Sequence, residues 1–214
     1  MVHVYYHIYA IDGVESIINE QLDLIKKHFD FPYILNVGIS IADENKSISN
    51  ILDILDKSKI RDVRAKGHEF VTLDLIQKDR EKFGDSDYIL YIHTKGASKQ
   101  LDKQYDNIIS WRHLMNYFNI EQCKKVFNIF EKTSYNTYGV LYSVLAKNKL
   151  YSGNFWWSTG KYIKTINIDG VKKNRFNAEI NYIQNGVDWK PYSLYNRGGE
   201  NHYSILFKRE EYAK

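Results

Sequence analysis

The sequence predicts an α/β fold in which parallel strands are covered by helices on both faces. Strand-like and helix-like patterns alternate through the first half of the chain, which is the signature of such a sheet. One strand-like run, Tyr88 to Ile92, is uncharged and unbroken, as is typical of a strand buried on both faces. The length of 214 residues favours a single domain with a core large enough to fold alone.

The elements of the first half follow from hydrophobic spacing and from turn residues. A strand rich in Val, Ile and Tyr opens the chain, and Asp12 and Gly13 then form a turn in which Asp12 is a candidate helix cap. Pro32 ends the helix that follows, and Ser47 is a candidate cap for the next one. Strands are expected at 2–9, 33–41, 60–65 and 88–92, and helices at 14–28, 48–55 and 70–76.

The second half has shorter and less regular patterns. Apolar residues at helical spacing predict a helix over 108–118, and Asn119 with Gln122 resembles a capping box that starts another through Phe130. Further strands are expected at 138–145, 150–157 and 202–207, and short helices at 161–166 and 176–183. Gly153 interrupts the second of these strands, which indicates a bulge or a ligand close to the backbone.

Composition excludes several classes of protein. The formal charge of +4, from 30 Lys and Arg against 26 Asp and Glu, is small and spread along the chain, so no nucleic-acid partner is expected. No apolar run approaches the length of a membrane span. The single cysteine, Cys123, excludes an internal disulfide, so a reducing, cytoplasmic location is expected. Its simplest interpretation is a small buried hydrophobe on a helix.

Polar and basic residues follow three of the predicted strands. Right-handed crossovers bring the loops after parallel strands to one edge, where such sheets bind ligands, so these segments are expected to converge. They are Tyr9, Ala10 and Ile11 after the first strand, Lys66, Gly67 and His68 after the third, and His93, Thr94 and Lys95 after the fourth. A base is expected against the first segment and phosphates near the other two, because lysine is a compact charge that suits a diphosphate.

Aromatic residues offer a second kind of surface. Trp156 and Trp157 are candidate platforms for the rings of an acceptor sugar. Adjacent residues of a strand point to opposite faces, so at most one of the two can face a site and the other is expected in the core. Arg197 precedes two glycines, and this segment is either a loop that closes over phosphate or a turn before the last strand.

Several motifs, taken in order, carry a family resemblance. The strand 88–92 looks like the strand of GT-A glycosyltransferases that ends in a metal-binding Asp-x-Asp motif, with His93 and Lys95 at the positions of the two aspartates. Residues 66–69 followed by this strand resemble the rhamnan-synthesis-type glycosyltransferases. The segments 152–157, 162–163, 175–179, 190–194 and 201–203 resemble the acceptor half of bacterial and large-virus (chlorella-virus-like) capsid-glycan glycosyltransferases.

The resemblance implies a GT-A fold with a central mixed, mostly parallel sheet, a nucleotide-binding half over 1–100 and an acceptor half over 101–214. It implies an inverting hexosyltransferase that moves a glucose- or rhamnose-like sugar from a nucleotide-diphosphate donor, expected to be UDP-linked, to a glycan acceptor. Gly153, Asn154, Arg197 and His202 are then expected to contact the donor. The alternative is a non-catalytic domain that binds a sugar nucleotide or a glycan. Such a chain can be one domain of a larger multi-transferase polypeptide, located in the host cytoplasm if its source is viral.

The departure from Asp-x-Asp bears on the cofactor. In most GT-A enzymes that pair holds Mn²⁺ or Mg²⁺ against the diphosphate, and such cations prefer oxygen ligands. The resemblance implies a divalent metal held by His93 and His202, while Lys95 can instead neutralise phosphate directly. Asp85 and Asp87 form a literal Asp-x-Asp, but they precede the strand and are expected at the opposite edge of the sheet.

Inversion requires one carboxylate to take the proton of the acceptor hydroxyl. Glu179 is the candidate, because its spacing from 152–157 is similar to that of the motif that supplies the base in inverting GT-A enzymes. Arg175 lies one turn earlier on the same helix face, so it can pair with Glu179 and contact the acceptor. Alternatively the two form a surface salt bridge of little energetic value. Asp169 and Asp188 are weaker candidates for the base.

Overall fold

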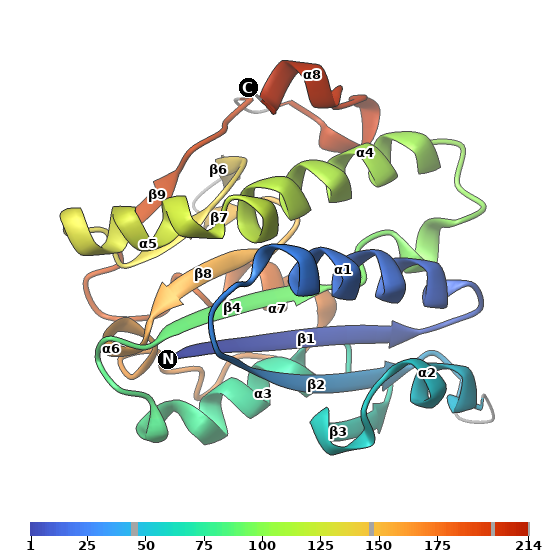
Figure 1. The fold of residues 1–214 in the computed structure, drawn as a ribbon, viewed down its shortest axis with the longest axis horizontal. Helices are drawn as coiled ribbons and strands as arrows, with labels where there is room; N and C mark the ends of the chain where they lie inside the picture. Colours follow the sequence, from blue (N-terminus) through green and yellow to red (C-terminus); the bar gives the residue numbers. More distant parts are fainter. Residues whose placement is uncertain (44–46, 146–147, 198–199, 214) are drawn as a thin grey trace.

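The chain folds around one central sheet. A computed structural model describes residues 1–43, 47–145, 148–197 and 200–213. Within these residues seven strands form a sheet in the order β3-β2-β1-β4-β8-β5-β9, and β6 and β7 form a separate hairpin (Figure 1). Strand β8 runs antiparallel to its neighbours β4 and β5, and the other adjacent pairs are parallel. The predicted α/β fold with a mixed, mostly parallel sheet flanked by helices is confirmed.

The first half closely follows the predicted alternation of strands and helices. Its strands are β1 (Val2–Ala10), β2 (Tyr33–Ile41), β3 (Ile60–Ala65) and β4 (Tyr88–His93), and its helices are α1 (Val14–His28), α2 (Ser49–Ile54) and α3 (Phe70–Asp79). Short 3₁₀ helices span Lys57–Lys59, Arg80–Lys82 and Ala97–Lys99. The start of α1 differs from the prediction, because its N-cap is Gly13 in a left-handed conformation and no side chain caps it.

The second half has more elements, and they are shorter. Its helices are α4 (Tyr105–Asn116), α5 (Cys123–Lys132), α6 (Gly160–Ile163), α7 (Arg175–Ile180) and α8 (Arg209–Tyr212). Its strands are β5 (Thr137–Gly139), β6 (Tyr142–Leu145), β7 (Asn148–Tyr151), β8 (Trp156–Thr159) and β9 (Pro191–Ser193). A π-helical segment, Tyr117–Glu121, joins α4 to α5, and a 3₁₀ helix spans His202–Ser204.

Several predicted boundaries in this half are wrong. Asn119 starts no new helix; its amide is buried and donates to the carbonyl of Met115 at 2.9 Å. The predicted strands 138–145 and 150–157 are each divided, at Leu141 (φ 53°) and at Gly153 (φ 92°), because the chain turns there in the left-handed region. Residues 202–207 form no strand. The second half instead ends the sheet with β9, an edge strand that begins at a proline as edge strands tolerate.

Helices cover both faces of the sheet (Figure 1). Helices α1, α4 and α5 pack on one face, and α3, α6 and α7 pack on the other. Residues of β1 alternate between the two cores, with Tyr6 facing the α1 side and Tyr5 the α3 side. Trp157 likewise faces the α1 side and Trp156 the α3 side. Two apolar layers therefore hold the sheet rigid beneath its carboxyl edge.

Cys123 is a buried part of α5. It is 1% exposed, and burial raises the pKa of its thiol to about 11, so the interpretation as a small buried hydrophobe is confirmed. None of the helices in the part of the chain that the structure describes is long and apolar enough to cross a bilayer.

Candidate functional site

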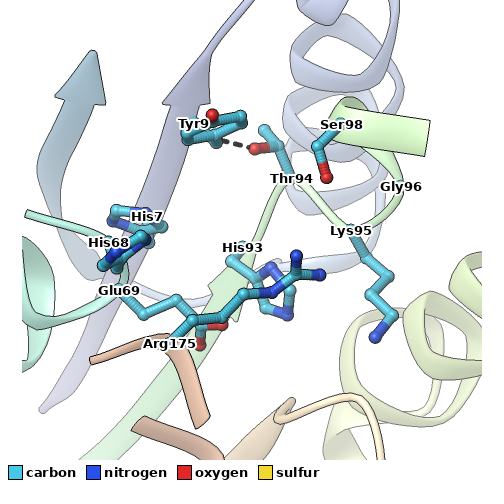
Figure 2. A pocket seen from close by; sticks show the side chains of 10 residues that line it. All are labelled: His7, Tyr9, His68, Glu69, His93, Thr94, Lys95, Gly96, Ser98 and Arg175. Atoms are coloured by element: carbon cyan, nitrogen blue, oxygen red, sulfur yellow. Dashed lines mark hydrogen bonds between the residues drawn. The ribbon is translucent and has the colours of Figure 1, made fainter. Parts of the chain in front are cut away.

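The carboxyl ends of β1, β3 and β4 meet around a cavity of about 130 Å³ (Figure 2). Strands β1 and β4 are in register up to His7 and His93, so the residues that follow them lie side by side. The backbone N–H of Tyr9 donates to the Thr94 hydroxyl at 2.9 Å. This strand-end cavity is lined by His7, Tyr9, His68, Glu69, His93, Thr94, Lys95, Gly96, Ser98 and Arg175. Each of the three segments expected to converge thus contributes to this cavity, the first through Tyr9, the second through His68 and the third through His93, Thr94 and Lys95.

A second and larger cavity, of about 630 Å³, adjoins the first. It shares four residues with the strand-end cavity and extends towards α7, so we call it the α7 cavity. Its lining residues are Glu69, His93, Lys95, Lys99, Asp102, Gln104, Gly153, Asn154, Arg175, Phe176, Glu179, Asn201 and Tyr203. The candidate site therefore combines strand ends of the first half with turns and α7 of the second.

His93 lies at the boundary of the two cavities. Figure 2 shows its imidazole with His7 and His68 on one side and Lys95 on the other. Its Nε2 is 2.8 Å from the carbonyl oxygen of Gly153; a carbonyl only accepts, so Nε2 carries the hydrogen and Nδ1 keeps a lone pair. Burial, and then the neighbouring Lys95 ammonium, lowers the pKa of His93 to about 3. The ring is therefore neutral at neutral pH.

His7 has a structural part in this arrangement. Its Nδ1 lies 3.1 Å from the Thr72 hydroxyl and its Nε2 lies 3.1 Å from that of Ser40. Burial lowers the pKa of this histidine to about 3 as well. Both ring nitrogens are engaged, so His7 anchors β1 to β2 and α3 and forms a neutral wall of the strand-end cavity.

Lys95 is the most enclosed cation of the two cavities. Its side chain is 8% exposed, and its ammonium lies 3.9 Å from the ring centroid of Trp111 and 5.7 Å from that of Tyr203. It has no hydrogen-bond or salt-bridge partner among the residues that the structure describes. Its charge is met only by aromatic faces, which attract cations more weakly than a carboxylate does.

The backbone beneath His93 and Lys95 is fixed from the helix side. The buried amide of Gln21 donates to the carbonyl of His93 at 3.2 Å, and the guanidinium of Arg112 donates to that of Lys95 at 3.0 Å. Arg112 also forms a salt bridge of 2.8 Å with Glu20 of α1. The segment therefore cannot shift without breaking buried polar contacts, which are costly to leave unsatisfied.

Gly96 completes this rigid segment. Its φ is 90°, and a Cβ placed on it would lie 2.9 Å from Ile108. Only glycine fits such a left-handed position so close to a helix. The glycine that follows the histidine and the lysine in the sequence therefore serves to turn the chain tightly.

The turn at Gly153 and Asn154 joins the two halves of the site. Both residues have positive φ, 92° and 57°. The N–H of Gly153 donates to Oε1 of Glu179 at 2.7 Å, and its carbonyl accepts from His93. The Asn154 amide donates to Oε2 of Glu69 at 2.6 Å. Positive φ in a residue other than glycine costs energy, and such strain tends to cluster at functional sites.

Glu179 lines the α7 cavity, as the base candidate should, but it does not pair with Arg175. No ion pair joins the two among the described residues; Glu179 is held by the backbone of Gly153, and its Oε2 has no partner there. The guanidinium of Arg175 points towards His93 and lines both cavities (Figure 2). The predicted pairing is wrong because α7 is short and its carboxylate turns to the Gly153 turn. Asp169 and Asp188 line neither cavity, and Asp188 pairs with Lys190 at 2.7 Å.

Glu69 is a site residue that the sequence analysis missed. It lies before α3, lines both cavities, and its Oε2 accepts from the Tyr91 hydroxyl at 2.9 Å as well as from Asn154. Lys66 and His68, just before it, have φ of 56° and 47°. The one available signal was its place after a predicted strand, in the segment already chosen for a ligand.

Several predicted donor residues lie outside both cavities. Ala10 is 1% exposed and belongs to the core, and Ile11 packs against that core. Lys66 and Gly67 line neither cavity, although His68 and Glu69 beside them do. Of these segments, Tyr9 lines the strand-end cavity, and in the loop after β3 the lining residues are His68 and Glu69 in place of Lys66 and Gly67.

The two late donor candidates are both engaged by neighbours. Arg197 forms salt bridges of 3.3 Å with Glu200 and 3.8 Å with Glu211, and the two glycines after it lie outside the described residues. His202 is 6% exposed, and its Nδ1 lies 2.8 Å from the Ser152 hydroxyl. Burial, and then Lys95, lowers the pKa of His202. Neither residue lines the two cavities.

The prediction of a tryptophan platform is wrong. Trp156 and Trp157 are both 0% exposed, because α6 and α7 cover one face of β8 and α1 and α5 cover the other. Their indole N–H groups donate to Asn154 Oδ1 at 3.0 Å and to the carbonyl of Asn119 at 2.8 Å. The aromatic rings that do line the α7 cavity are those of Phe176, which is 64% exposed, and Tyr203.

The side chains around the cavities do not fit a divalent cation. Among the residues described, no three His, Cys, Asp or Glu side chains come together as a metal would need. His93 and His202 line no common cavity, and the Lys95 ammonium that lowers the pKa of both would repel a cation. The arrangement instead offers fixed positive charge from Lys95 and Arg175 beside the carboxylates of Glu69 and Glu179.

Comparison with known proteins bears on the family and on the fold. Residues 3–202 match the family described as Domain of unknown function (DUF8361). The chain belongs to this family. None of the curated proteins compared with this DUF8361 member matches its sequence.

Two solved structures are similar to this DUF8361 chain in their overall trace. One is a 4-diphosphocytidyl-2C-methyl-D-erythritol synthase with 10% identity and a TM-score of 0.44, covering 98% of this chain and 93% of that chain. The other is such a synthase from Anaerococcus prevotii DSM 20548 with 10% identity and a TM-score of 0.39, covering 99% and 92%.

Proposed function

We propose that this DUF8361 chain is a glycosyltransferase that takes a nucleotide-diphosphate sugar as donor and a glycan hydroxyl as acceptor. One observation carries the proposal. The carboxyl ends of β1, β3 and β4 meet at cavities that hold two cations without partners among the described residues, Lys95 and Arg175, beside the carboxylates of Glu69 and Glu179. Cations at this edge suit the phosphates of a nucleotide, and carboxylates suit sugar hydroxyls and proton transfer.

The two cavities divide the substrates between them in this proposal. The strand-end cavity, with Tyr9 and His68, takes the nucleoside, so residues 1–100 supply most of the nucleotide-binding half. The diphosphate lies against Lys95 and Arg175, at the boundary that both cavities share. The sugar and the acceptor occupy the α7 cavity, where residues 101–214 supply the acceptor half, and the exposed ring of Phe176 offers a stacking surface.

The chemistry requires one base and a stabilised leaving group. Glu179 removes the proton of the acceptor hydroxyl while that oxygen bonds to the anomeric carbon and the bond from this carbon to the diphosphate breaks. The hydrogen bond from the Gly153 N–H orients the carboxylate. Negative charge grows on the departing diphosphate, where Lys95 and Arg175 meet it. A single base and direct displacement give inversion, and the resemblance of 66–69 and of β4 supports a UDP-linked, glucose- or rhamnose-like hexose.

Thermal unfolding of the whole chain tests the first step. UDP, GDP, CMP and dTDP compounds are added one at a time, each with and without Mn²⁺. A ligand of the native state at a hundred times its dissociation constant stabilises it by about 2.7 kcal/mol, so one nucleoside diphosphate should raise the melting temperature by several degrees. The matching sugar nucleotide is then assayed for release of its nucleoside diphosphate with glycan acceptors. The proposal fails if no nucleotide stabilises the chain.

A non-catalytic binding domain is the second candidate. It is favoured by one observation, that β4 ends in His93 and Lys95 where GT-A enzymes have paired acids. Tight binding of a sugar nucleotide with no turnover on any acceptor would support this candidate over the enzyme.

A further inference from the structure

Among the described residues, the buried ammonium of Lys95 has no hydrogen-bond or salt-bridge partner. It lies 3.9 Å from the ring centroid of Trp111 and 5.7 Å from that of Tyr203, and the residue is 8% exposed. Buried charges in proteins are as a rule paired. Glu69 accepts from Tyr91 and Asn154, and Glu179 accepts from Gly153 through Oε1. Among the described residues neither carboxylate forms an ion pair with Lys95. The partner of this ammonium is therefore best supplied by an anionic ligand.

The same surroundings offer a divalent cation few ligands and a repelling charge. His93 uses Nε2 to hold the carbonyl of Gly153, so only Nδ1 keeps a lone pair. Among the residues described, His93 belongs to no group of three or more His, Cys, Asp or Glu side chains that could hold a metal ion. A cation at this point would also meet the repulsion of Lys95, which lines the same two cavities.

We infer that Lys95 takes the place of the metal and binds the diphosphate of the donor directly, without a divalent cation. This inference rests on the proposed function and specifies how its ligand is held. The class of ligand is a nucleoside diphosphate, whose phosphate oxygens accept from the three N–H groups of the ammonium, with Arg175 as a second cation.

The fold prepares Lys95 for this role. Arg112 holds its carbonyl, Gln21 holds the carbonyl of His93, and Gly96 turns the chain where no other residue fits. The two aromatic rings restrict the ammonium without neutralising it. A charge fixed before the ligand arrives costs little reorganisation on binding, which is the advantage a bound metal ion otherwise provides.

Calorimetric titration of the whole chain tests this inference. The probe is UDP, or whichever nucleoside diphosphate raises the melting temperature most, titrated in EDTA and again in excess Mn²⁺. We expect the two dissociation constants to agree within about threefold, a difference below 1 kcal/mol. In EDTA, Lys95→Met should weaken binding by about 30-fold or more, as the loss of one partner of a buried charge pair does. Lys95→Arg should recover part of that loss.

The matched control is Lys124→Met. Lys124 of α5 lines neither cavity, is 66% exposed and pairs with Asp30 at 2.5 Å, so its loss should change binding less than about threefold, as exposed pairs do. A second measurement needs no variant: in EDTA, wild-type chain should bind uridine, or the matching nucleoside, about 30-fold more weakly than the diphosphate.

The outcomes separate the two proposals. Binding that appears only with Mn²⁺ overturns the metal-free inference and leaves the glycosyltransferase standing. Metal-free binding that Lys95→Met does not weaken, or a nucleoside that binds as well as its diphosphate, overturns the role of Lys95. No binding of any nucleoside diphosphate under either condition overturns the proposed function itself.

Discussion

The two halves of the molecule build their shares of the site by different means. In the first half, β1 and β4 are neighbouring parallel strands in the interior of the sheet, and their carboxyl ends deliver Tyr9, His93 and Lys95 to one edge. In the second half, strands of three or four residues end at left-handed turns, and the Gly153 turn positions Glu179. The first half holds the charge of Lys95 in a fixed position at the ends of rigid strands. The second half positions the proposed proton acceptor, Glu179, through a strained turn.

The largest expected effect concerns the catalytic base and shows which half of the chain supplies it. Glu179→Gln keeps an oxygen that accepts from the Gly153 N–H but removes the basic group, so turnover of the sugar nucleotide should fall by roughly 10²–10⁴-fold. Binding of the nucleoside diphosphate should be unchanged, as measured by calorimetry on the same preparation.

Two variants make this result specific. Glu210→Gln, on the exposed surface of α8, should leave turnover unchanged. Glu69→Gln changes the carboxylate that the first half contributes. If turnover collapses in Glu69→Gln and survives in Glu179→Gln, the base is Glu69 of the first half, and its assignment to Glu179 of the second half is wrong.

The next effect tests the strained turn. Gly153→Ala places a Cβ 2.4 Å from the sulfur of Met115 at a φ of 92°. The left-handed conformation costs an alanine about 1–2 kcal/mol, and crowding of a packed core adds about 1–3 kcal/mol. We therefore expect a loss of roughly 2–5 kcal/mol in the free energy of unfolding, measured with urea, and a parallel loss of turnover because Glu179 and His93 are both held by this residue.

Gly170 is the matched control. Its φ is 77°, but nothing lies within 4 Å of a Cβ placed on it, so Gly170→Ala should cost only the conformational part, about 1–2 kcal/mol. Equal losses in the two variants would show that the Gly153 turn has room to relax and that its geometry does not control the site.

The difference between the halves also explains what the sequence could predict. A parallel strand in the middle of a sheet is mostly apolar along its length, so β2 was predicted over the residues it occupies. Tyr9 near the end of β1, and His93, Thr94 and Lys95 at the end of β4, were predicted as site residues and line the strand-end cavity. The second half is divided at Leu141 and Gly153, whose left-handed backbone depends on tertiary contacts that no local pattern contains.

The errors at the site have the same origin. Trp156 and Trp157 look like platforms in the sequence, but which faces the helices cover is decided only by packing. Glu69 looks like a solvated charge in a loop, yet positive φ at Lys66 and His68 precedes a turn that brings it to Tyr91 and Asn154. Site residues could thus be predicted where the end of a strand fixes their position. They could not be predicted where a strained turn fixes it.

The salt bridge between Arg112 and Glu20 joins α4 of the second half to α1 of the first, and we call it the α1–α4 joint. Breaking it should lower the free energy of unfolding less than the change at Gly153. Arg112 of α4 is 4% exposed at its side chain and pairs with Glu20 of α1. Arg112→Leu leaves that carboxylate partly buried without its main partner and the Lys95 carbonyl without a donor, so the free energy of unfolding should fall by about 3 kcal/mol.

Lys190 provides the control for this change. Its side chain is 43% exposed and pairs at 2.7 Å with Asp188, which is 69% exposed, so Lys190→Leu should cost at most about 1 kcal/mol in the same urea titration. A small loss for Arg112→Leu as well would mean that α1 and α4 are held together by apolar packing alone.

The smallest expected effect is the pH dependence of the same joint. Burial raises the pKa of Glu20, but hydrogen bonds from His113 and Arg112 outweigh burial and lower the pKa from 4.5 to about 2. A carboxyl whose pKa is lower in the folded state stabilises the fold above its ordinary pKa and loses that contribution as the pH falls. The stabilising effect of Glu20 should therefore be complete above pH 4.5 and disappear between pH 4.5 and 2.

The variant Glu20→Gln isolates this contribution. One pKa unit corresponds to about 1.4 kcal/mol, and the side chain of Glu20 is 26% exposed, so solvent reduces the effect to about 2 kcal/mol at neutral pH. The difference in the free energy of unfolding between wild type and Glu20→Gln should hold from pH 7 to 5 and shrink towards zero by pH 2, while Glu210→Gln shows no such difference. A difference that persists unchanged at pH 2 would mean that Glu20 contributes by its shape and its hydrogen bond with Asn116, and that charge does not hold α1 of the first half to α4 of the second.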